Sequence, residues 1–432
     1  ELSWQALPVD GQLLGWLFGL FTPVQLPWVL IQAVAKQIPD LNNPIAACVK
    51  LQQMSLLKRT SKNSFCMHRM LHGFFQLKMQ HDTDLQEAKR QALLYFCRKI
   101  PARCNAIEAE DFIPIEPHVV AAIHNGQHDK ELYQALQCYF VGRGLYRQSY
   151  EWAEQALENY EHQKDIDAEQ LAYWHKQAGE RAHLSALYAA ALSHLEQAES
   201  ILKNNESSEL MAEVLVILAA TQRAMGQLEQ AEITSRIALE LCQQYFDDDS
   251  QEILEAQMIQ TTAKFIKQLQ SDSKDLDGLK QQVQNIAYIR EQTQPDDGNA
   301  IAEALNLLAK IKEAQGHNEG AIVHYRKAVL LTHPPHTDAA KARNNLAKAL
   351  EPIADEKEVI DLYKTAIQIF AEAELFGAQG WCMRNLGMYY ARRNKDRGLA
   401  MMKRACNLLE RHNAPRHSMC EDSLKALHKR LS

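Results

Sequence analysis

The feature that most constrains how this chain can fold is an internal repeat, which begins near residue 130 and continues almost to the C-terminus. This part of the sequence is rich in Ala, Leu, Glu, Gln and Lys, residues that favour helices. Each unit combines Leu-Ala or Leu-Gly, a short turn that often carries Gly, and an Ala-x3-large-x2-Ala pattern. A helical hairpin of this kind leaves one apolar face uncovered, which only the next hairpin can bury. The repeat therefore predicts an all-α solenoid.

The clearest copy of the unit is ALNLLAKIKEAQGHNEGAIVHYRKAVLLTHPP. Its turn is at Gly316, its small positions are Ala309, Ala321 and Ala328, and its large position is Tyr325. Small residues let two antiparallel helices approach closely, and the large residue fills the space between them. Comparable turns are expected near residues 144, 186, 226, 270, 316, 354 and 394, at spacings of roughly 38 to 45 residues.

This pattern resembles the tetratricopeptide repeat family, although the units are longer than that family's usual length of about 34 residues. The spacing is similar to that of the long-helix variant found in kinesin light chains and in signalling ATPases. The resemblance implies a superhelical solenoid of about seven repeats over residues 129–412. The polar stretch over residues 413–432 is expected to form a C-terminal cap helix.

Residues 1–80 have a different pattern, in which short apolar helices precede a β-hairpin. Asn43 is a candidate N-cap, and Pro44 suits the first position of the helix that follows. Helices are expected over residues 10–21, 26–38, 42–54 and 68–79, and a strand–turn–strand over residues 55–67. This order predicts a small winged-helix-like module over residues 1–80, joined to the repeats by a helical connector over residues 81–128.

The stretch SLLKRTSKNSFCMHRMLHGFF (55–75) resembles a junction found in STAND-type ATPases of the NB-ARC class, where a hairpin strand runs into a helix after the nucleotide-binding core. The resemblance implies that His68 contacts the bound nucleotide in an intact parent protein, although Arg69 replaces the Asp of the family's motif. The alternative is that His68 caps or packs at the strand–helix junction. The large apolar residues here are expected to pack in the core; they are Phe65, Met67, Met70, Leu71, Phe74 and Phe75.

The chain contains no GxxxxGK[ST] motif and no Gly-Lys pair, so it lacks the loop that cradles nucleotide phosphates. No nucleophile or acid–base motif is recognisable either, and we expect no enzyme activity and no cofactor. The resemblance therefore implies that this chain is the C-terminal half of a bacterial signalling ATPase. Its nucleotide-binding domain is then expected N-terminal to this chain.

The candidate binding site is the concave groove of the repeats. Aligning the repeats on their turns places a set of polar residues on the groove side of the first helix of three units; they are Asn306, Lys310, Lys341, Asn344, Asn345, Lys348, Arg384, Asn385 and Arg392. Asn side chains can pair with a peptide backbone, while Lys and Arg favour acidic side chains or a terminal carboxylate. The alternative is a solvated helix face whose Asn residues bond within their own hairpin.

Charge argues against nucleic acid as the partner. The whole chain carries a net charge of −7; residues 1–80 carry +4, which leaves −11 for the rest. The third helix of the winged-helix-like module, which would read DNA, has Lys50 as its single basic residue.

Membrane and metal sites are also not expected. The apolar run over residues 13–31 is interrupted by Pro23 and Pro27, which predicts two short helices instead of a membrane span. The nine Cys residues contain no CxxC pair, which is typical of reduced thiols and a cytoplasmic location. His68 and His72 lie four residues apart, but no metal-ligand pattern surrounds them.

The function that these features favour is the sensor region of a STAND-type regulator. It would bind a protein or peptide trigger in the repeat groove and relay that event through the winged-helix-like module. One alternative is a stand-alone scaffold or adaptor built on the same repeats. A second alternative is a transcriptional regulator that uses the winged helix to bind DNA.

Overall fold

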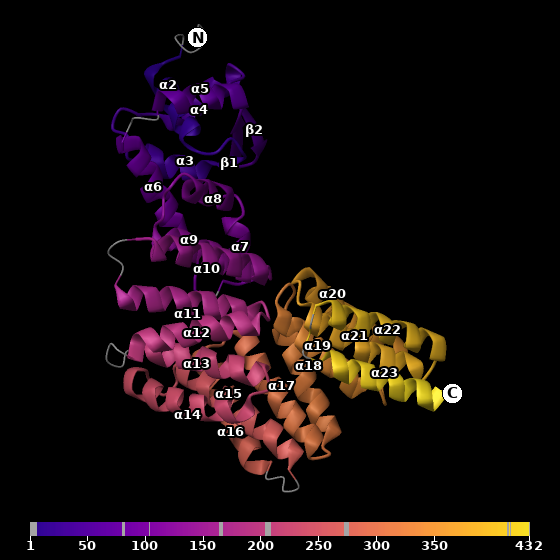
Figure 1. Cartoon of the computed structure of the whole chain (residues 1–432). Helices are drawn as coiled ribbons and strands as arrows, with labels where there is room; N and C mark the ends of the chain where they lie inside the picture. Colours follow the sequence, from indigo (N-terminus) through magenta and orange to yellow (C-terminus); the bar gives the residue numbers. More distant parts are fainter. Residues whose placement is uncertain are drawn as a thin grey trace. The chain divides into compact units, whose positions relative to one another are not determined.

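The computed structural model describes residues 7–79, 83–102, 104–163, 167–203, 209–271, 276–412, 414 and 416–431. The chain divides into two compact units, Glu1–Gly142 and Arg143–Ser432 (Figure 1). Both are dominated by helices, and the strands all lie in the first unit. The predicted all-α fold with a small strand-bearing head is therefore confirmed.

The first unit begins with the expected order of three helices, a hairpin and a fourth helix. These elements are α2 (Val9–Leu20), α3 (Trp28–Ala35), α4 (Pro44–Gln53), β2 (Leu57–Ser61), β3 (Ser64–Met67) and α5 (Arg69–Met79). A short strand that was not predicted, β1 (Leu26–Pro27), pairs antiparallel with β3, so the sheet order is β1-β3-β2. Four more helices follow: α6 (Thr83–Cys97), α7 (Ala106–Phe112), α8 (Glu116–His124) and α9 (Lys130–Gly142).

One amide and one carboxylate fix the start of α4 in this head, those of Asn43 and Asp10. The side chain of Asn43 accepts a hydrogen bond from the backbone N–H of Ala46 at 3.0 Å, which confirms the expected N-cap of α4. The carboxylate of Asp10 accepts the backbone N–H groups of Asn42 and Asn43 at 3.3 and 2.9 Å. A side chain on α2 therefore fixes the start of α4, across more than thirty residues of sequence.

The apolar run of the N-terminus forms two separate helices, because α2 ends at Leu20 and α3 begins only at Trp28. Pro23 and Pro27 lie between them or at the boundary, as expected from their missing N–H groups. Among the described residues, no helix combines the length and the hydropathy that a membrane crossing requires.

The stretch from Phe65 to Phe75 packs largely as predicted, with one exception. Phe65, Met67 and Phe75 are buried, and the backbone of Gly19 approaches Phe75 so closely that a larger residue would collide with it. Met70, by contrast, is 80% exposed, so its predicted role in the core is wrong. The buried face of α5 contains Phe75, and Met70 lies at a spacing from it that points to the opposite side of the helix.

The second unit consists of helices arranged as consecutive antiparallel pairs (Figure 1). They are α10 (Tyr146–Glu161), α11 (Ala168–Leu184), α12 (Tyr188–Lys203), α13 (Glu209–Ala224), α14 (Leu228–Tyr245), α15 (Gln251–Gln270), α16 (Asp277–Thr293), α17 (Gly298–Ala314), α18 (Asn318–Leu331), α19 (Thr337–Leu350), α20 (Glu356–Glu372), α21 (Phe376–Ala391), α22 (Lys395–Arg411) and α23 (His417–Leu431). Six of the seven predicted turns fall between two of these helices, including the one near residue 270 that was placed by spacing alone, and the turn near residue 144 falls between α9 and α10.

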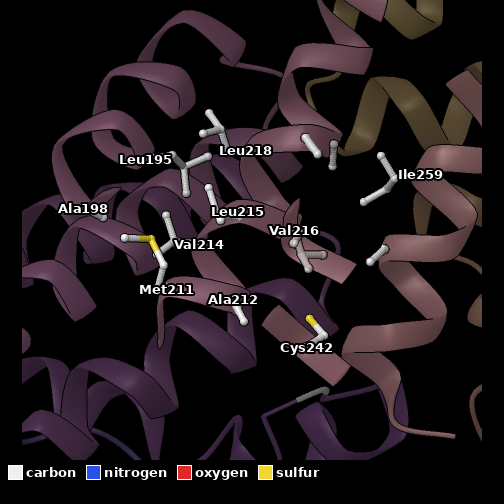
Figure 2. Packing of buried hydrophobic residues seen from close by; sticks show 14 of the residues in the cluster. Leu195, Ala198, Met211, Ala212, Val214, Leu215, Val216, Leu218, Cys242 and Ile259 are labelled. Atoms are coloured by element: carbon white, nitrogen blue, oxygen red, sulfur yellow. The ribbon is translucent and has the colours of Figure 1, made fainter. Parts of the chain in front are cut away.

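The core of this unit lies between the helices of each pair and between neighbouring pairs. Ala309, Ala321 and Ala328 are fully buried, and Tyr325 is nearly so, as the repeat pattern predicts. Figure 2 shows one cluster in which side chains of α12, α13, α14 and α15 meet, among them Leu195, Leu215, Cys242 and Ile259. Each pair thus completes the core of the next, as expected for a solenoid.

Two hairpins carry the same hydrogen bond near the turn that joins their two helices. The hydroxyl of Tyr325 on α18 donates to Glu313 on α17 at 2.7 Å, and that of Tyr363 on α20 donates to Glu351, beside α19, at 2.8 Å. The two pairs have the same sequence separation of twelve residues. Burial and the adjacent carboxylate raise the pKa of both tyrosines, so both stay protonated as donors.

The stack curves until its beginning meets its sixth hairpin. The buried hydroxyl of Tyr146 at the start of α10 accepts the backbone N–H of Thr337 at 3.3 Å, across 191 residues of sequence. Beside it, Gly144 has a φ of +70°, and a Cβ there would lie 2.9 Å from the carbonyl oxygen of Pro335. These contacts join the start of α10 to the start of α19 and so close one turn of the superhelix.

The closure can be tested at Gly144. Gly144→Ala should lower the free energy of unfolding by about 2 kcal/mol, because the new Cβ meets both an unfavourable φ and the Pro335 carbonyl. Gly226→Ala is the matched control, since Gly226 has a φ of +82° but open space around it, and its cost should be about 1 kcal/mol. Urea unfolding followed by circular dichroism measures both values, and equal losses would contradict the closure.

Candidate functional site on the inner surface of the repeats

The first helix of each hairpin lines the inner surface of the superhelix. These helices are α11, α13, α15, α17, α19 and α21, and we refer to them as the inner helices. Consecutive inner helices from α11 to α19 contact each other directly, and α21 contacts α23. Side chains on their shared face therefore come together even though about 40 residues of sequence separate neighbouring helices.

A row of side-chain amides crosses three inner helices. The amide of Asn345 on α19 donates to Asn306 on α17 at 3.4 Å, and the amide of Asn385 on α21 donates to Asn344 on α19 at 3.1 Å. Arg384 extends the row, because it donates to Ser423 on α23 at 2.7 Å. We call this row the amide ladder. Its bonds join successive hairpins and not the two helices of one hairpin.

The asparagines of the amide ladder were all expected on the exposed side of their helices, but the structure buries some of them. Asn306 and Asn385 are only 9% and 8% exposed, while Asn344 and Asn345 are half-buried. The reason is the close stacking of the inner helices, which covers amides that point along the stack. The more exposed amides are those of Asn344 and Asn345, at adjacent positions of α19, and the amide of Asn344 also donates to Asn345 Oδ1 at 3.4 Å.

Exposed cations lie beside the ladder. Lys310 is on α17 one turn after Asn306, and Lys341 and Lys348 flank the two asparagines of α19; all three lysines are exposed. The Nζ of Lys341 lies 2.8 Å from Asp338 Oδ1. These side chains thus combine amides with positive charge.

The exposed side chain of Lys310 is surrounded by other cationic side chains that act on its charge. Desolvation by the surrounding protein, followed by the positive charges of Arg223, Arg416 and Lys341, lowers the pKa of Lys310 to about 8. These cations come from α13, from the residues before α23 and from α19. Charged groups from several parts of the stack therefore act on the pKa of Lys310.

A histidine on α11 bonds to the neighbouring inner helix, α13. Nδ1 of His183 donates to Thr221 Oγ1 at 3.0 Å, because that hydroxyl itself donates to the carbonyl of Ile217. Desolvation, Arg223 and Lys341 lower the pKa of His183 to about 4. His183 is therefore neutral near pH 7 and adds a polar group without adding charge.

Arg392 lies apart from the ladder, at the end of α21. It donates to Glu351 at 2.7 Å, the same carboxylate that accepts the hydroxyl of Tyr363. The structure therefore brings Asn306, Asn344, Asn345, Arg384 and Asn385 together, whereas Arg392 bonds at the rim.

Two of the cations that lower the pKa of Lys310, Arg223 and Arg416, were not among the predicted site residues. Arg223 lies three residues before the turn glycine Gly226, one helical turn beyond the register that was used to choose Lys310. Extending the register by one turn would have found it. Arg416 precedes the cap helix, where no repeat register exists, so the sequence holds no comparable signal for it.

In the first unit, His68 lies at the strand–helix junction. It is exposed, and its Nδ1 accepts the backbone N–H of Met70 at 3.3 Å, which caps the start of α5. His72 is buried and bonds to the backbone carbonyl of Phe21, so the two histidines do not converge on one point. Within the described ranges, no group of three or more His, Cys, Asp or Glu side chains is placed to hold a metal ion.

No protein-family model and no curated protein matches this sequence. Solved structures do match. A STAND protein with a tetratricopeptide repeat sensor from Pyrococcus horikoshii superposes with a TM-score of 0.56 at 15% identity, over 98% of this chain and 60% of its own. This chain thus spans about three fifths of the length of that protein.

Two Rap proteins are also similar. The Rap conjugation gene regulator of plasmid pLS20, solved with the Phr* peptide, has a TM-score of 0.53 at 12% identity, over 92% of this chain and 95% of its own. A Rap protein complexed with competence and sporulation factor has a TM-score of 0.51 at 13% identity, over 79% and 98%. Together with the hairpin order, these similarities establish a helical solenoid of the tetratricopeptide repeat type.

The ladder can be tested by removing one amide. Asn345→Ala should lower the free energy of unfolding by about 1–3 kcal/mol, because Asn306 then keeps a buried oxygen without its donor. Lys348→Ala, an exposed position of the same helix, should change it by less than about 0.5 kcal/mol. Denaturant unfolding of both variants checks this, and a loss as small for Asn345→Ala as for Lys348→Ala would refute the ladder's role.

Proposed function

We propose that the inner surface of residues 143–432 binds a peptide, or an extended segment of a protein, as the recognition step of a signalling event. The observation that carries this proposal is the pairing of accessible amides, Asn344 and Asn345, with exposed lysines inside a closed superhelical turn. Amides that donate and accept can bond an extended backbone, and nearby cations select the charge of its side chains. The Rap structures, which contain a peptide or factor, support the same mode.

We further propose that this chain is the sensor region of a STAND-type regulator and is not itself an enzyme. The similarity to the Pyrococcus horikoshii STAND protein along 98% of this chain supports that assignment. So does the order of a hairpin-bearing head followed by repeats. In such a parent, a nucleotide-binding domain would precede the head, and His68 would face its nucleotide. A Walker-type loop encoded within about 300 residues upstream of this chain would agree with the assignment to a STAND-type regulator. A reading frame that terminates in that upstream region would instead favour a stand-alone scaffold.

Peptide binding can be measured with the full chain and a soluble library of synthetic octapeptides. We expect a set of peptides to be retained, and Lys348→Glu to weaken their binding by about tenfold, because it reverses a charge beside the accessible amides. Lys357→Glu, at an exposed position on α20, should leave binding unchanged. Lys348 is a cleaner test than Arg384, whose bond to Ser423 also supports the cap helix.

Two results would count against the site. Retention of no peptide would argue against peptide binding, and equal affinities for Lys348→Glu and Lys357→Glu would move the site away from the inner surface.

The exposed face of the winged-helix-like head is poorly suited to bind DNA. The exposed face of α4, the helix that would enter the major groove, presents Ile45 at 62% and Val49 at 48% exposure, one turn apart. Lys50 is its only basic residue. We therefore expect no binding of duplex DNA even at low salt, measured by fluorescence anisotropy across a salt series. Salt-dependent binding would instead support the transcriptional regulator.

A further inference from the structure

We propose that Cys406 and Cys420 are a redox modification site, at which a reversible disulfide fixes the helix α23 to the repeat that precedes it. The reagent that oxidises the pair is a low-molecular-weight disulfide, of which oxidised glutathione is the probe used below. This inference does not depend on whether the inner surface binds a peptide.

The two sulfurs meet where α22 contacts α23 (Figure 1). Sγ of Cys406 on α22 lies 2.6 Å from Sγ of Cys420 on α23, and both cysteines are free thiols in this structure. The sulfurs of a disulfide are about 2.05 Å apart, so a shift of roughly half an ångström would bring this pair to bonding distance. The sulfur of Cys382 on α21 has a different neighbour, because it lies 3.7 Å from the backbone carbonyl of Tyr363.

The surrounding side chains hold the two sulfurs in place. Cys406 is 5% exposed and Cys420 has no exposed surface, and both belong to one buried cluster with Ala405, Leu409 and Ala414. Because this packing restricts both side chains, the second thiol is already positioned to attack when the first has reacted.

Two neighbouring thiols can also bind a soft metal ion, but structural metal sites of that kind use about four ligands. Within the ranges that the structure describes, no group of three or more His, Cys, Asp or Glu side chains is placed to hold a metal ion. A disulfide needs only the two sulfurs, so the geometry favours oxidation over metal binding.

The burial that aligns the thiols also protects them in the closed state. Burial raises the pKa of both thiols, that of Cys420 to about 12, so that the closed state holds almost no thiolate near neutral pH. Reaction therefore requires α23 to open, which returns the thiols to water and to their ordinary pKa. The main contacts of α23 are with α21 and α22, and opening one helix costs less free energy than unfolding the whole chain.

The reaction is a pair of thiol–disulfide exchanges. The thiolate of one cysteine attacks a sulfur of oxidised glutathione, which forms a mixed disulfide and releases one glutathione thiolate. The thiolate of the other cysteine then attacks the protein sulfur of the mixed disulfide and releases the second glutathione. One S–S bond forms in the protein and one breaks in glutathione, the protein loses two electrons that glutathione gains, and the two protein protons pass to the two glutathione thiols.

The disulfide would secure a helix that supports the end of the amide ladder. Arg384 on α21 donates to Ser423 on α23 at 2.7 Å, and Leu427 of α23 packs in a cluster with Met402 of α22. In the reduced protein, contacts of this kind hold α23 by themselves. A covalent link between α22 and α23 restricts the opened state, so oxidation should make opening of α23 rarer.

The experiment uses the full chain, which is reduced, freed of reductant and incubated with oxidised glutathione at about pH 8. The remaining thiols are alkylated, and the protein is digested with trypsin without reduction. Trypsin leaves Cys406 in the peptide 405–411 and Cys420 in the peptide 417–425, each with a single cysteine. We expect these two peptides to be joined, to weigh two hydrogens less than their sum, and to separate when dithiothreitol is added.

Hydrogen exchange followed by mass spectrometry measures the consequence for α23. The amides of α23 should exchange about tenfold more slowly in the oxidised than in the reduced protein, whereas those of α13 should not change. Cys420→Ala should abolish both the joined peptides and the effect of oxidation on exchange. Cys382→Ala, which alters another buried cysteine, is the matched control and should keep both. Circular dichroism confirms that each variant is folded.

Two results would overturn the proposal. One is recovery of Cys406 and Cys420 as separate alkylated or glutathione-bound peptides, or joined to other cysteines, after oxidation of the folded chain. The other is joined peptides without slower exchange in α23, because the disulfide would then not fix the helix. The peptide map of the unaltered chain keeps the test decisive even if Cys420→Ala does not fold. None of these outcomes bears on peptide binding.

Discussion

The structure of the second unit depends on close contact between helices that are lined with small residues. Ala309, Ala321 and Ala328 have no exposed surface, and Gly179 and Gly380 lie against the side chains of Leu195 and Leu409 on the paired helix. A Cβ at either glycine would come within 3 Å of these leucines. Because each hairpin buries its outer face only on its neighbour, the packing of one pair sets the position of the next.

Repeated packing of this kind curves the stack of hairpins. Each hairpin is rotated slightly relative to the last, and the rotations add until Tyr146 meets Thr337. Inner helices that are distant in sequence thereby face one another. Desolvation and the charges of Arg223 and Lys341, which belong to other repeats, together lower the pKa of Lys310.

The sequence was a reliable guide wherever a local pattern decides the structure. The turn glycines, the N-cap at Asn43 and the hairpin around Ser61 are all governed by neighbouring residues, and the structure places them as expected. Repeat register also identified the amides and lysines of the inner surface. It could not show that Asn306 and Asn385 are buried, because their exposure depends on how tightly adjacent hairpins stack. Met70 was misplaced for a similar reason, since the packing of α5 decides which of its sides is covered, and Met70 lies on an exposed side.

By itself, therefore, the sequence determined the all-α repeat architecture, the order of elements in the head and the residue types along the inner helices. These follow from helix propensity, periodicity and turn chemistry, which act over a few residues. Only the tertiary structure decided which side chains meet. The amide ladder and the contact of Gly144 with Pro335 both depend on the accumulated rotation of the stack. That rotation arises from packing between hairpins, and no single repeat encodes it.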